Sequence, residues 1–379
     1  MTKARQNPSQ ERPGSPPPES PCEPLRRRRN RSPDECIDGI LGGDRTILAQ
    51  AITLIESSRE ADRGLAEQIV EACLPHSGRS IRVGITGVPG AGKSSVIETL
   101  GGYLISELRQ KVAVLTVDPS SRISGGSILG DKTRMESLAS SDMAFIRPSP
   151  SRGSLGGVAQ CTREVMLLCE AAGYKNILVE TVGVGQSEAA VHNMVDFFLL
   201  LALAGAGDEL QGIKRGVMEL VNVVTINKAD GENRQAAETA RKEAQSALHY
   251  LPAAPSGWTP RALICSAKTG KGVPELWHCV QEYVNLTQEN GWFHRARQRQ
   301  VHKWMHEIVD GGLRRRFDAH PAIRARKVIL EKELLEGRIT SLRAARELLD
   351  AYADEFEGKD ELSCPTPQSL DDGTSKRKL

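Results

Sequence analysis

The chain has 379 residues, and its 50 Lys and Arg residues nearly balance 48 Asp and Glu residues, for a formal net charge of +2. This balance gives no reason to expect nucleic acid or an anionic membrane as a partner. The longest apolar run, residues 197–204, is far shorter than the ~20 residues that a membrane-spanning helix needs. No membrane association is therefore expected.

The cysteines and the N-terminus predict an intracellular location. The 8 cysteines are scattered and include no Cys-x-x-Cys pair, which favours a reducing compartment over a disulfide framework or a zinc site. The N-terminus lacks the apolar core of a secretory signal. We expect a cytoplasmic protein, or one of the mitochondrial matrix if the source is eukaryotic.

Both ends of the chain are predicted to be disordered. Residues 1–35 contain eight of the 20 prolines and a run of four arginines at 26–29, and the end of the chain, 357–379, is similarly polar. Such segments bury too little apolar surface to offset the entropy lost on ordering. The acidic residues and the Pro-Pro-Pro run of the N-terminal segment argue against an amphipathic transit helix.

Helical patterns flank a central segment of different character. In residues 36–78, apolar positions such as Ile40, Leu48 and Ile52 recur at helical spacing, which predicts a small helical extension. Residues 291–356 predict charged helices with apolar positions such as Leu330 and Leu348. Polar helices of this kind pack on the parent domain or on another subunit.

The central segment, residues 79–290, alternates short apolar runs with helical stretches. The runs predicted to be strands are 81–86, 112–117, 144–146, 177–179, 197–203, 221–226 and 262–265. This alternation is typical of strands buried between helices on both faces. The sequence therefore predicts an α/β fold with a doubly wound, mostly parallel sheet.

A phosphate-binding motif follows the first predicted strand. It reads Gly87, Val88, Pro89, Gly90, Ala91, Gly92, Lys93 and Ser94, followed by Ser95, and it matches the P-loop pattern Gly-x4-Gly-Lys-Ser. In a P-loop, backbone N–H groups and the N-terminus of the next helix converge on phosphate oxygens. Lys93 is predicted to span the β- and γ-phosphates, and Ser94 to bind Mg²⁺.

Two further strands end in carboxylates that are candidates for the same site. Asp118 follows the run 112–117, and Glu180 follows the run 177–179. Because the carboxyl ends of parallel strands meet at one edge of the sheet, both acids are expected near the P-loop and its Mg²⁺. Taken singly, each could instead cap the helix that follows it.

The base-recognition motif lies farther along the chain. Asn227, Lys228 and Asp230 form the pattern Asn-Lys-x-Asp, and Ser266, Ala267 and Lys268 follow the last predicted strand. Guanine presents two adjacent donors that one carboxylate, Asp230, can accept, whereas adenine would leave the acid unpaired at a cost of about 1–3 kcal/mol. We expect Asn227 and the Ala267 N–H to contact the base as well. The pattern predicts GTP as the nucleotide.

Together these motifs resemble a known family, the methylmalonyl-CoA mutase-associated GTPases of the MeaB/ArgK type, within the SIMIBI class of P-loop proteins. The resemblance covers roughly residues 36–350, and it is carried by the strings at 87–95, 118–121, 125–135, 180–188, 207–216 and 227–230. It implies a GTP hydrolase that acts as a chaperone for the adenosylcobalamin-dependent mutase, with cobalamin involved only through that partner. It also implies a homodimer built partly through the C-terminal helices.

The resemblance also implies roles for individual residues. Those implied at the Mg²⁺ and its water network are Ser94, Asp118, Asp131 and Glu180, and the catalytic set is Lys93, Glu180, Asp118 and Gln186. Gln186 would sense the γ-phosphate, and Lys214 would couple the nucleotide state to the partner. The alternative for Gln186 is a polar loop residue, for Lys214 a solvated charge, and for Asp131 a local pair with Arg134.

Three other functions compete with this one. A metal-delivery GTPase of the same class would need a His-rich or Cys-rich tract, but the eight histidines are dispersed. A transport-system protein kinase of the LAO/AO type would use ATP, for which Asp230 is unsuited. A non-enzymatic adaptor would not need Lys93, Ser94 and Glu180 all to be intact.

Overall fold

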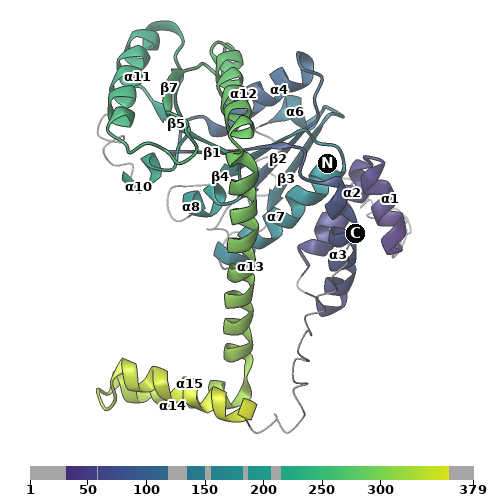
Figure 1. Ribbon diagram of the computed structural model, residues 1–379, viewed down its shortest axis with the longest axis vertical. Coiled ribbons are helices and arrows are strands. Elements are labelled where there is room, and N and C mark those ends of the chain that lie inside the picture. Colours follow the sequence, from purple (N-terminus) through teal and green to yellow (C-terminus); the bar gives the residue numbers. More distant parts are fainter. Residues whose placement is uncertain are drawn as a thin grey trace, which may run out of the picture.

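A computed structural model describes residues 31–57, 59–117, 135–149, 155–181, 187–205 and 215–357 (Figure 1). The predicted tails fall mainly outside these ranges. The first helix, α1 (Pro33–Leu41), starts inside the segment predicted to be disordered. Ser32 and Glu35 form a capping box at its N-terminus, which satisfies backbone N–H groups that the first turn leaves unpaired.

The described strands form a seven-stranded sheet in which all the pairings are parallel, in the order β3-β2-β4-β1-β5-β6-β7. In chain order the strands are β1 (Ile81–Gly87), β2 (Val112–Val117), β3 (Ala144–Ser149), β4 (Asn176–Thr181), β5 (Phe197–Leu203), β6 (Val223–Asn227) and β7 (Arg261–Ile264). The predicted α/β parallel fold is confirmed. The predicted run 221–226 began too early, because Val221 and Asn222 precede the strand, which starts at Val223.

Helices cover both faces of the sheet and enclose two apolar cores. One face carries α7 (Leu155–Ala171), α8 (Ser187–His192) and α11 (Arg234–His249), and the other carries α4 (Lys93–Ser106), α6 (Glu136–Ala139) and α12 (Val273–Glu289). Short helical elements complete this part: 3-10 turns at Leu74–His76 and Gly231–Asn233, and α10 (Arg215–Met218). Strands buried on both faces explain why their sequences are apolar throughout rather than alternating.

The N-terminal extension packs on one of these faces. Helices α1, α2 (Arg45–Ile55) and α3 (Glu60–Cys73) contact one another and α7, and their buried side chains, including Ile40, Leu48 and Ile69, belong to the same core as α7. The extension is therefore continuous with the α/β body.

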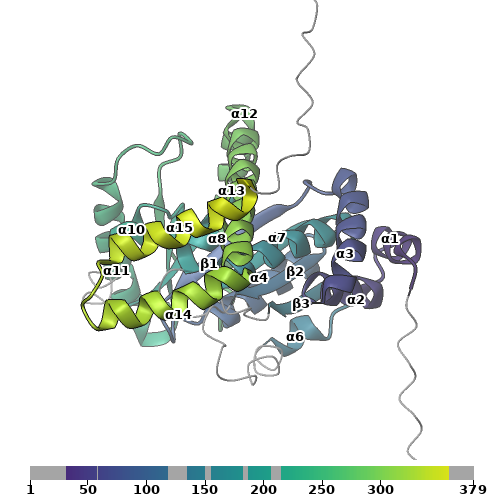
Figure 2. The same cartoon turned by 90° about the horizontal axis from the view of Figure 1, so that it is seen from below.

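The C-terminal helices form a long arm. Helix α13 (Trp292–Ala319) runs along the body and away from it, and α14 (Pro321–Leu335) and α15 (Ser341–Glu357) lie side by side at its far end (Figures 1 and 2). Phe293 is buried against the body, whereas Met305 and Val309 are exposed. The first turns of α13 thus belong to the body. In the described parts of the chain, no helix has the length and apolar character required to cross a bilayer.

Candidate nucleotide-binding site

The P-loop connects the end of β1 to the start of α4, as the motif predicts. Gly90 and Gly92 both adopt the left-handed backbone conformation, with φ of 83° and 84°. A Cβ added to Gly92 would lie 2.6 Å from the side-chain nitrogen of Asn227, whereas one added to Gly90 would meet nothing within 4 Å. Glycine is thus required at 92 by both backbone conformation and space, and at 90 by conformation alone.

Lys93 lies at the centre of the site. Its Nζ donates a hydrogen bond to the Gly87 carbonyl at 2.7 Å and a longer one to Val88 at 3.4 Å. Burial lowers the pKa of Lys93, and the charges of Glu180 and Glu188 oppose that shift. The loop therefore holds a positive charge close to its own backbone, where an anion can bind.

Ser94 and Glu180 form the oxygen-rich part of the site. Strand β4 pairs directly with β1, so the end of β4 lies beside the P-loop, and the Ser94 hydroxyl donates to Glu180 Oε1 at 3.0 Å. Glu180 is only 5% exposed. One residue on, Thr181 donates to the Thr86 hydroxyl at 2.9 Å, which joins the two strand ends.

This arrangement fits a Mg²⁺ ion in donor chemistry. A hydroxyl and a buried carboxylate are hard oxygen donors, and Mg²⁺ at nucleotide sites takes one or two such ligands together with phosphate oxygens and water. The described residues include no cluster of three or more His, Cys, Asp or Glu side chains placed to hold a metal by themselves. Among the described residues, Ser94 and Glu180 are therefore the ones that would contact a Mg²⁺ ion bound together with a nucleotide.

The base-recognition loops are joined to the P-loop by hydrogen bonds, chiefly those of Asn227. The Asn227 amide donates to the Ala91 carbonyl at 2.8 Å, and its oxygen accepts from the Ala267 N–H at 3.2 Å. Thr99 of α4 also donates to the Ala267 carbonyl at 2.7 Å. Asn227 therefore links the P-loop to the loop that carries Ala267. The contact of Asn227 with the base stays a prediction.

Asp230 is positioned by a neighbouring loop. Its Oδ1 accepts a hydrogen bond from the Ser266 hydroxyl at 2.8 Å. Lys228 has a left-handed backbone with φ of 59°, which is unusual for a residue other than glycine, and its side chain is exposed, as are those of Lys268 and Ser95. The carboxylate of Asp230 is therefore fixed in orientation, while the two lysine stems remain accessible.

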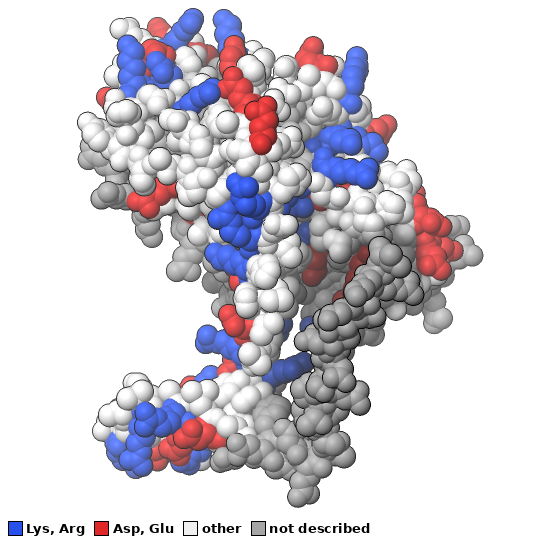
Figure 3. All heavy atoms as spheres, viewed as in Figure 1, with Lys and Arg blue, Asp and Glu red and all other residues white. Residues whose placement is uncertain are grey.

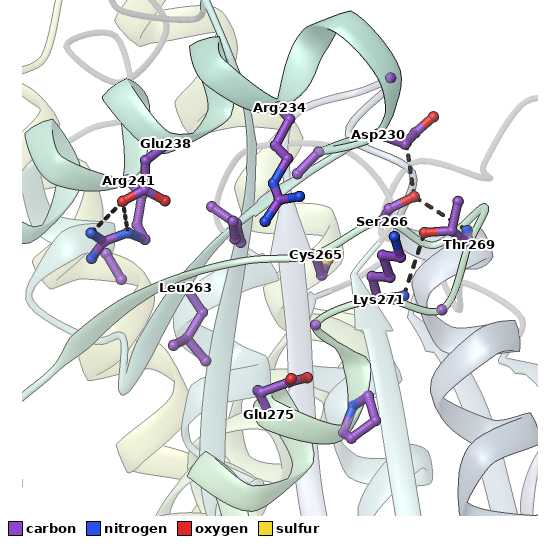
Figure 4. Close-up of a pocket in the computed structure, with 17 residues that line it drawn as sticks. Asp230, Arg234, Glu238, Arg241, Leu263, Cys265, Ser266, Thr269, Lys271 and Glu275 are labelled. Atoms are coloured by element: carbon purple, nitrogen blue, oxygen red, sulfur yellow. Dashed lines mark hydrogen bonds and ion pairs between the residues drawn. The ribbon is translucent and has the colours of Figure 1, made fainter.

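A groove of about 960 Å³ adjoins these loops along the edge strand β7. Figure 4 shows Asp230, Ser266 and Thr269 on one side of it, joined by hydrogen bonds, and Arg234, Glu238 and Arg241 on the other. The residues that line it include none from the P-loop. The groove therefore extends outward from the base-recognition loops and does not contain the phosphate-binding loop.

Four of the predicted site residues lie outside the described residues: Asp118, Asp131, Gln186 and Lys214. One residue that the sequence motifs did not single out is Glu188 of α8, which is 4% exposed and contributes charge near Lys93. The sequence feature that could have indicated Glu188 is its position eight residues after Glu180, at the end of the string 180–188.

This geometry can be compared with that of known proteins. Residues 48–322 match the family model described as methylmalonyl-CoA mutase-associated GTPase MeaB. The chain belongs to the MeaB family. With its P-loop fold, this membership makes the protein a GTPase of the MeaB class.

Several MeaB relatives are closely similar. The chain is 48% identical over 321 residues to a Mycobacterium tuberculosis protein named as a probable GTPase, covering 84% of this chain and 95% of the relative. It is 49% identical over 276 residues to Escherichia coli GTPase ArgK, covering 73% and 83%. It is 42% identical over 340 residues to the mouse protein named methylmalonic aciduria type A homolog, mitochondrial, covering 87% and 82%.

A solved structure agrees with the fold of this MeaB-family chain. The crystal structure of a protein named LAO/AO transport system kinase matches with a TM-score of 0.69 and 36% sequence identity, over 86% of this chain and 99% of that one. The P-loop fold with helical extensions is therefore shared by both proteins.

Proposed function

We propose that this protein hydrolyses GTP with Mg²⁺ at the site formed by the P-loop, Glu180 and Asp230, and that it acts as a chaperone for an adenosylcobalamin-dependent methylmalonyl-CoA mutase. The observation that carries the chemistry is the hydrogen bond of Ser94 to buried Glu180, 3.0 Å, beside Lys93. Burying a charged carboxylate is costly, and a metal-bound nucleotide facing Glu180 would offset that cost.

Each residue has a distinct part in this proposal. Backbone N–H groups of residues 87–94 and the start of α4 bind the phosphates, and Lys93 neutralises charge on the β- and γ-phosphates. Ser94 and Glu180 would hold Mg²⁺, which supplies charge stabilisation when bound. Asp118 and Asp131 are proposed for the same metal and water network, and Gln186 for γ-phosphate sensing.

The residues favour this function over the alternatives. Asp230, oriented by Ser266, is suited to the two guanine donors, which argues against an ATP-using kinase even though the similar solved structure is named a kinase. A structural nucleotide without turnover would leave the placement of Glu180 unexplained. Support for the mutase as partner comes from the name of the family and of the mouse relative.

Base choice provides the direct test of nucleotide identity. Calorimetric titration should show GTP binding roughly tenfold tighter than ATP or better, because Asp230 can satisfy both guanine donors. Asp230→Asn should shift the preference toward xanthosine triphosphate, whose 2-oxo group accepts from an amide. Exposed Glu232→Gln, two residues away, is the matched control and should keep the preference for GTP. Equal affinities for ATP and GTP would overturn the assignment.

A second experiment tests the chaperone role. Single-turnover GTP hydrolysis is measured with and without purified adenosylcobalamin-dependent methylmalonyl-CoA mutase. Addition of the mutase should raise the rate, because binding of the partner can order a positioning loop that is not in place when the protein acts alone. Lys214→Ala should keep the intrinsic rate and lose the stimulation, whereas the exposed Lys242→Ala should keep both. Full stimulation of Lys214→Ala would reject the coupling role while leaving GTP hydrolysis intact.

The arm supports a homodimer as the assembly. Met305 and Val309 lie one turn apart on α13 and are 51% and 49% exposed, which is unusual for large apolar side chains on a polar helix. Met305→Glu with Val309→Glu should give a monomer by light scattering, whereas exposed Gln298→Glu should not. A monomeric wild-type chain would contradict the dimer. An intracellular location, cytoplasmic or mitochondrial, completes the proposal.

A further inference from the structure

Helix α8 connects the nucleotide site to the base of the arm. It lies between β4 and β5 in the chain, and both strands run parallel to β1, so this connection crosses the sheet from its carboxyl end to its amino end. Along the way α8 contacts β4, β1 and α7. Residues 193–196 then lead from α8 into β5, beside the first turns of α13 (Figure 1).

The first turn of α8 places an acid near the P-loop lysine. Glu188 is 4% exposed, and its helix contacts the two strands whose ends carry Glu180 and the P-loop. Burial lowers the pKa of Lys93, and the negative charges of Glu180 and Glu188 oppose that shift. Lys93 is also the residue proposed to neutralise the γ-phosphate. A γ-phosphate would therefore bring its charge to the ammonium group on which Glu188 acts.

The segment that follows α8 contacts α13. The Val195 carbonyl accepts a hydrogen bond from the Gln300 side chain at 2.8 Å, and the Asp196 carboxylate pairs with Arg297 at 2.6 Å. Figure 3 shows basic side chains along the upper half of α13, the part that lies against the body. The arm is thus attached directly to the residues that α8 positions.

Helix α8 and the two residues after it form one packed unit. The N–H groups of Asn193 and Met194 donate to carbonyls inside the helix, those of Ala189 and Val191, at 3.2 and 3.0 Å. Val191 and Met194 are at most 1% exposed and belong to the same core as α7. Because a close-packed core transmits strain, a displacement of α8 also shifts the residues that follow it.

We propose that α8 couples the γ-phosphate to the attachment of the arm: the phosphate displaces Glu188, and the shift of α8 weakens the bond between Val195 and Gln300. Like charges repel, so the γ-phosphate and the Glu188 carboxylate compete for the ammonium group of Lys93. GDP lacks the γ-phosphate and leaves α8 in place. This coupling rests on the proposed binding of GTP at the site.

Coupling between two sites is reciprocal, and this fixes the direction of the expected effect. If the γ-phosphate weakens the bond of Gln300, then loss of that bond must favour a nucleotide that carries a γ-phosphate. Gln300→Met keeps the length of the side chain and removes its N–H donor. It should raise the affinity for a non-hydrolysable GTP analogue about fivefold, the effect of one hydrogen bond, and leave the affinity for GDP unchanged.

The test is calorimetric titration of the full chain, in the presence of Mg²⁺, with GDP and separately with the GTP analogue. Gln298→Met, at an exposed position of the same helix, is the matched control and should keep the wild-type ratio of the two affinities. Glu307→Gln weakens a different contact of the arm, the 2.8 Å ion pair with Arg163 of α7, and should also keep that ratio. An unchanged ratio in Gln300→Met, or an equal change in Glu307→Gln, would overturn the proposal.

A double variant tests whether Glu188 and Gln300 act through the same displacement. Glu188→Gln removes the charge that the γ-phosphate repels, so it should raise the affinity for the analogue relative to GDP about tenfold or more. Addition of Gln300→Met should then change the ratio no further, because α8 is no longer displaced. If the two substitutions instead multiplied each other's effects, the coupling through α8 would be wrong.

Amide hydrogen exchange gives a readout that does not depend on affinity. In the wild type, residues 193–196 and 297–304 should exchange faster with the analogue than with GDP, and in Glu188→Gln they should exchange equally fast with both. Each variant is first compared with the wild type in its thermal unfolding midpoint, and the wild-type exchange decides the outcome if a variant does not fold. Failure of GTP to bind would reject the proposed function, whereas normal binding of both nucleotides with identical exchange rejects only the coupling.

Discussion

The two ends of the sheet are built in different ways. At the carboxyl end, the P-loop and the base-recognition loops consist of short continuous motifs, and several of their contacts run to backbone groups, as in the bond from Asn227 to the Ala91 carbonyl. At the amino end, Arg82, Glu170, Asp196 and Arg297 form ion pairs between residues about 90–100 positions apart. One end has a sequence signature and the other has none.

This difference shows what each end requires. A phosphate loop needs glycines and N–H groups in a fixed local order, so its function is encoded in consecutive residues. A buried ion-pair cluster needs only that complementary charges meet after folding, and any part of the chain can supply them. We therefore expect substitutions at the amino end to affect stability, and those at the carboxyl end to affect chemistry.

The largest expected effect is on stability at the amino end. Arg297→Met should lower the free energy of unfolding by about 3–5 kcal/mol, because it leaves Asp196, whose side chain is 2% exposed, as an uncompensated buried charge. Urea unfolding measures the effect. Arg241→Met removes the partner of Glu238 in a surface ion pair whose side chains are 30% and 39% exposed, and it is the control, with no measurable change expected. Equal destabilisation by both variants would contradict the contrast between the ends.

The next prediction compares substitutions of two buried acids, Glu180 and Glu170, to separate effects on chemistry from effects on stability. Glu180→Gln should slow single-turnover GTP hydrolysis by about 10²-fold or more and retain much of the nucleotide binding, because Glu180 is proposed to organise charge stabilisation in the transition state. Glu170→Gln, at the other end, should leave the rate per folded molecule unchanged and reduce stability. If Glu170→Gln slowed hydrolysis and Glu180→Gln reduced only stability, the two ends of the sheet would not separate chemistry from stability.

Substitutions of two P-loop glycines test the hydrogen bond between Asn227 and the Ala91 carbonyl. Gly90→Ala and Gly92→Ala impose the same left-handed backbone penalty, about 1–2 kcal/mol, but only the added methyl at 92 meets Asn227, 2.6 Å away. Gly92→Ala should therefore be less stable than Gly90→Ala by about 1 kcal/mol, the value of the displaced hydrogen bond. Urea unfolding without nucleotide measures both. Identical stabilities would mean that Asn227 shifts at no cost.

The smallest expected effect is a dependence of stability on acid pH. Burial alone would raise the pKa of Glu170, but the Arg82 charge and hydrogen bonds from Arg82, Ser80 and Gly78 hold it below its ordinary value of 4.5. Since the folded-state pKa is depressed, the stabilisation is complete above pH 4.5 and is lost as the pH falls below that value. Glu170→Gln should unfold with a weaker dependence on pH in that range. An unchanged slope in the urea midpoint at these acid pH values would contradict the assignment.

The sequence determined the parallel α/β fold, the P-loop and the base-recognition loops, because strand burial on both faces produces continuous apolar runs and because phosphate binding requires consecutive residues. It also located Glu180 correctly at a strand end beside Lys93. It did not determine that Asn227 would bind Ala91 and Ala267, that Glu188 would be buried near Lys93, or that the start of α13 would be fixed by Arg297. Those contacts join residues from different elements, and only the order of strands in the sheet and the packing of helices on it decide which side chains meet. The charge of Arg297 and that of Asp196 are visible in the sequence, but their pairing exists only once β1, β5 and α13 lie side by side.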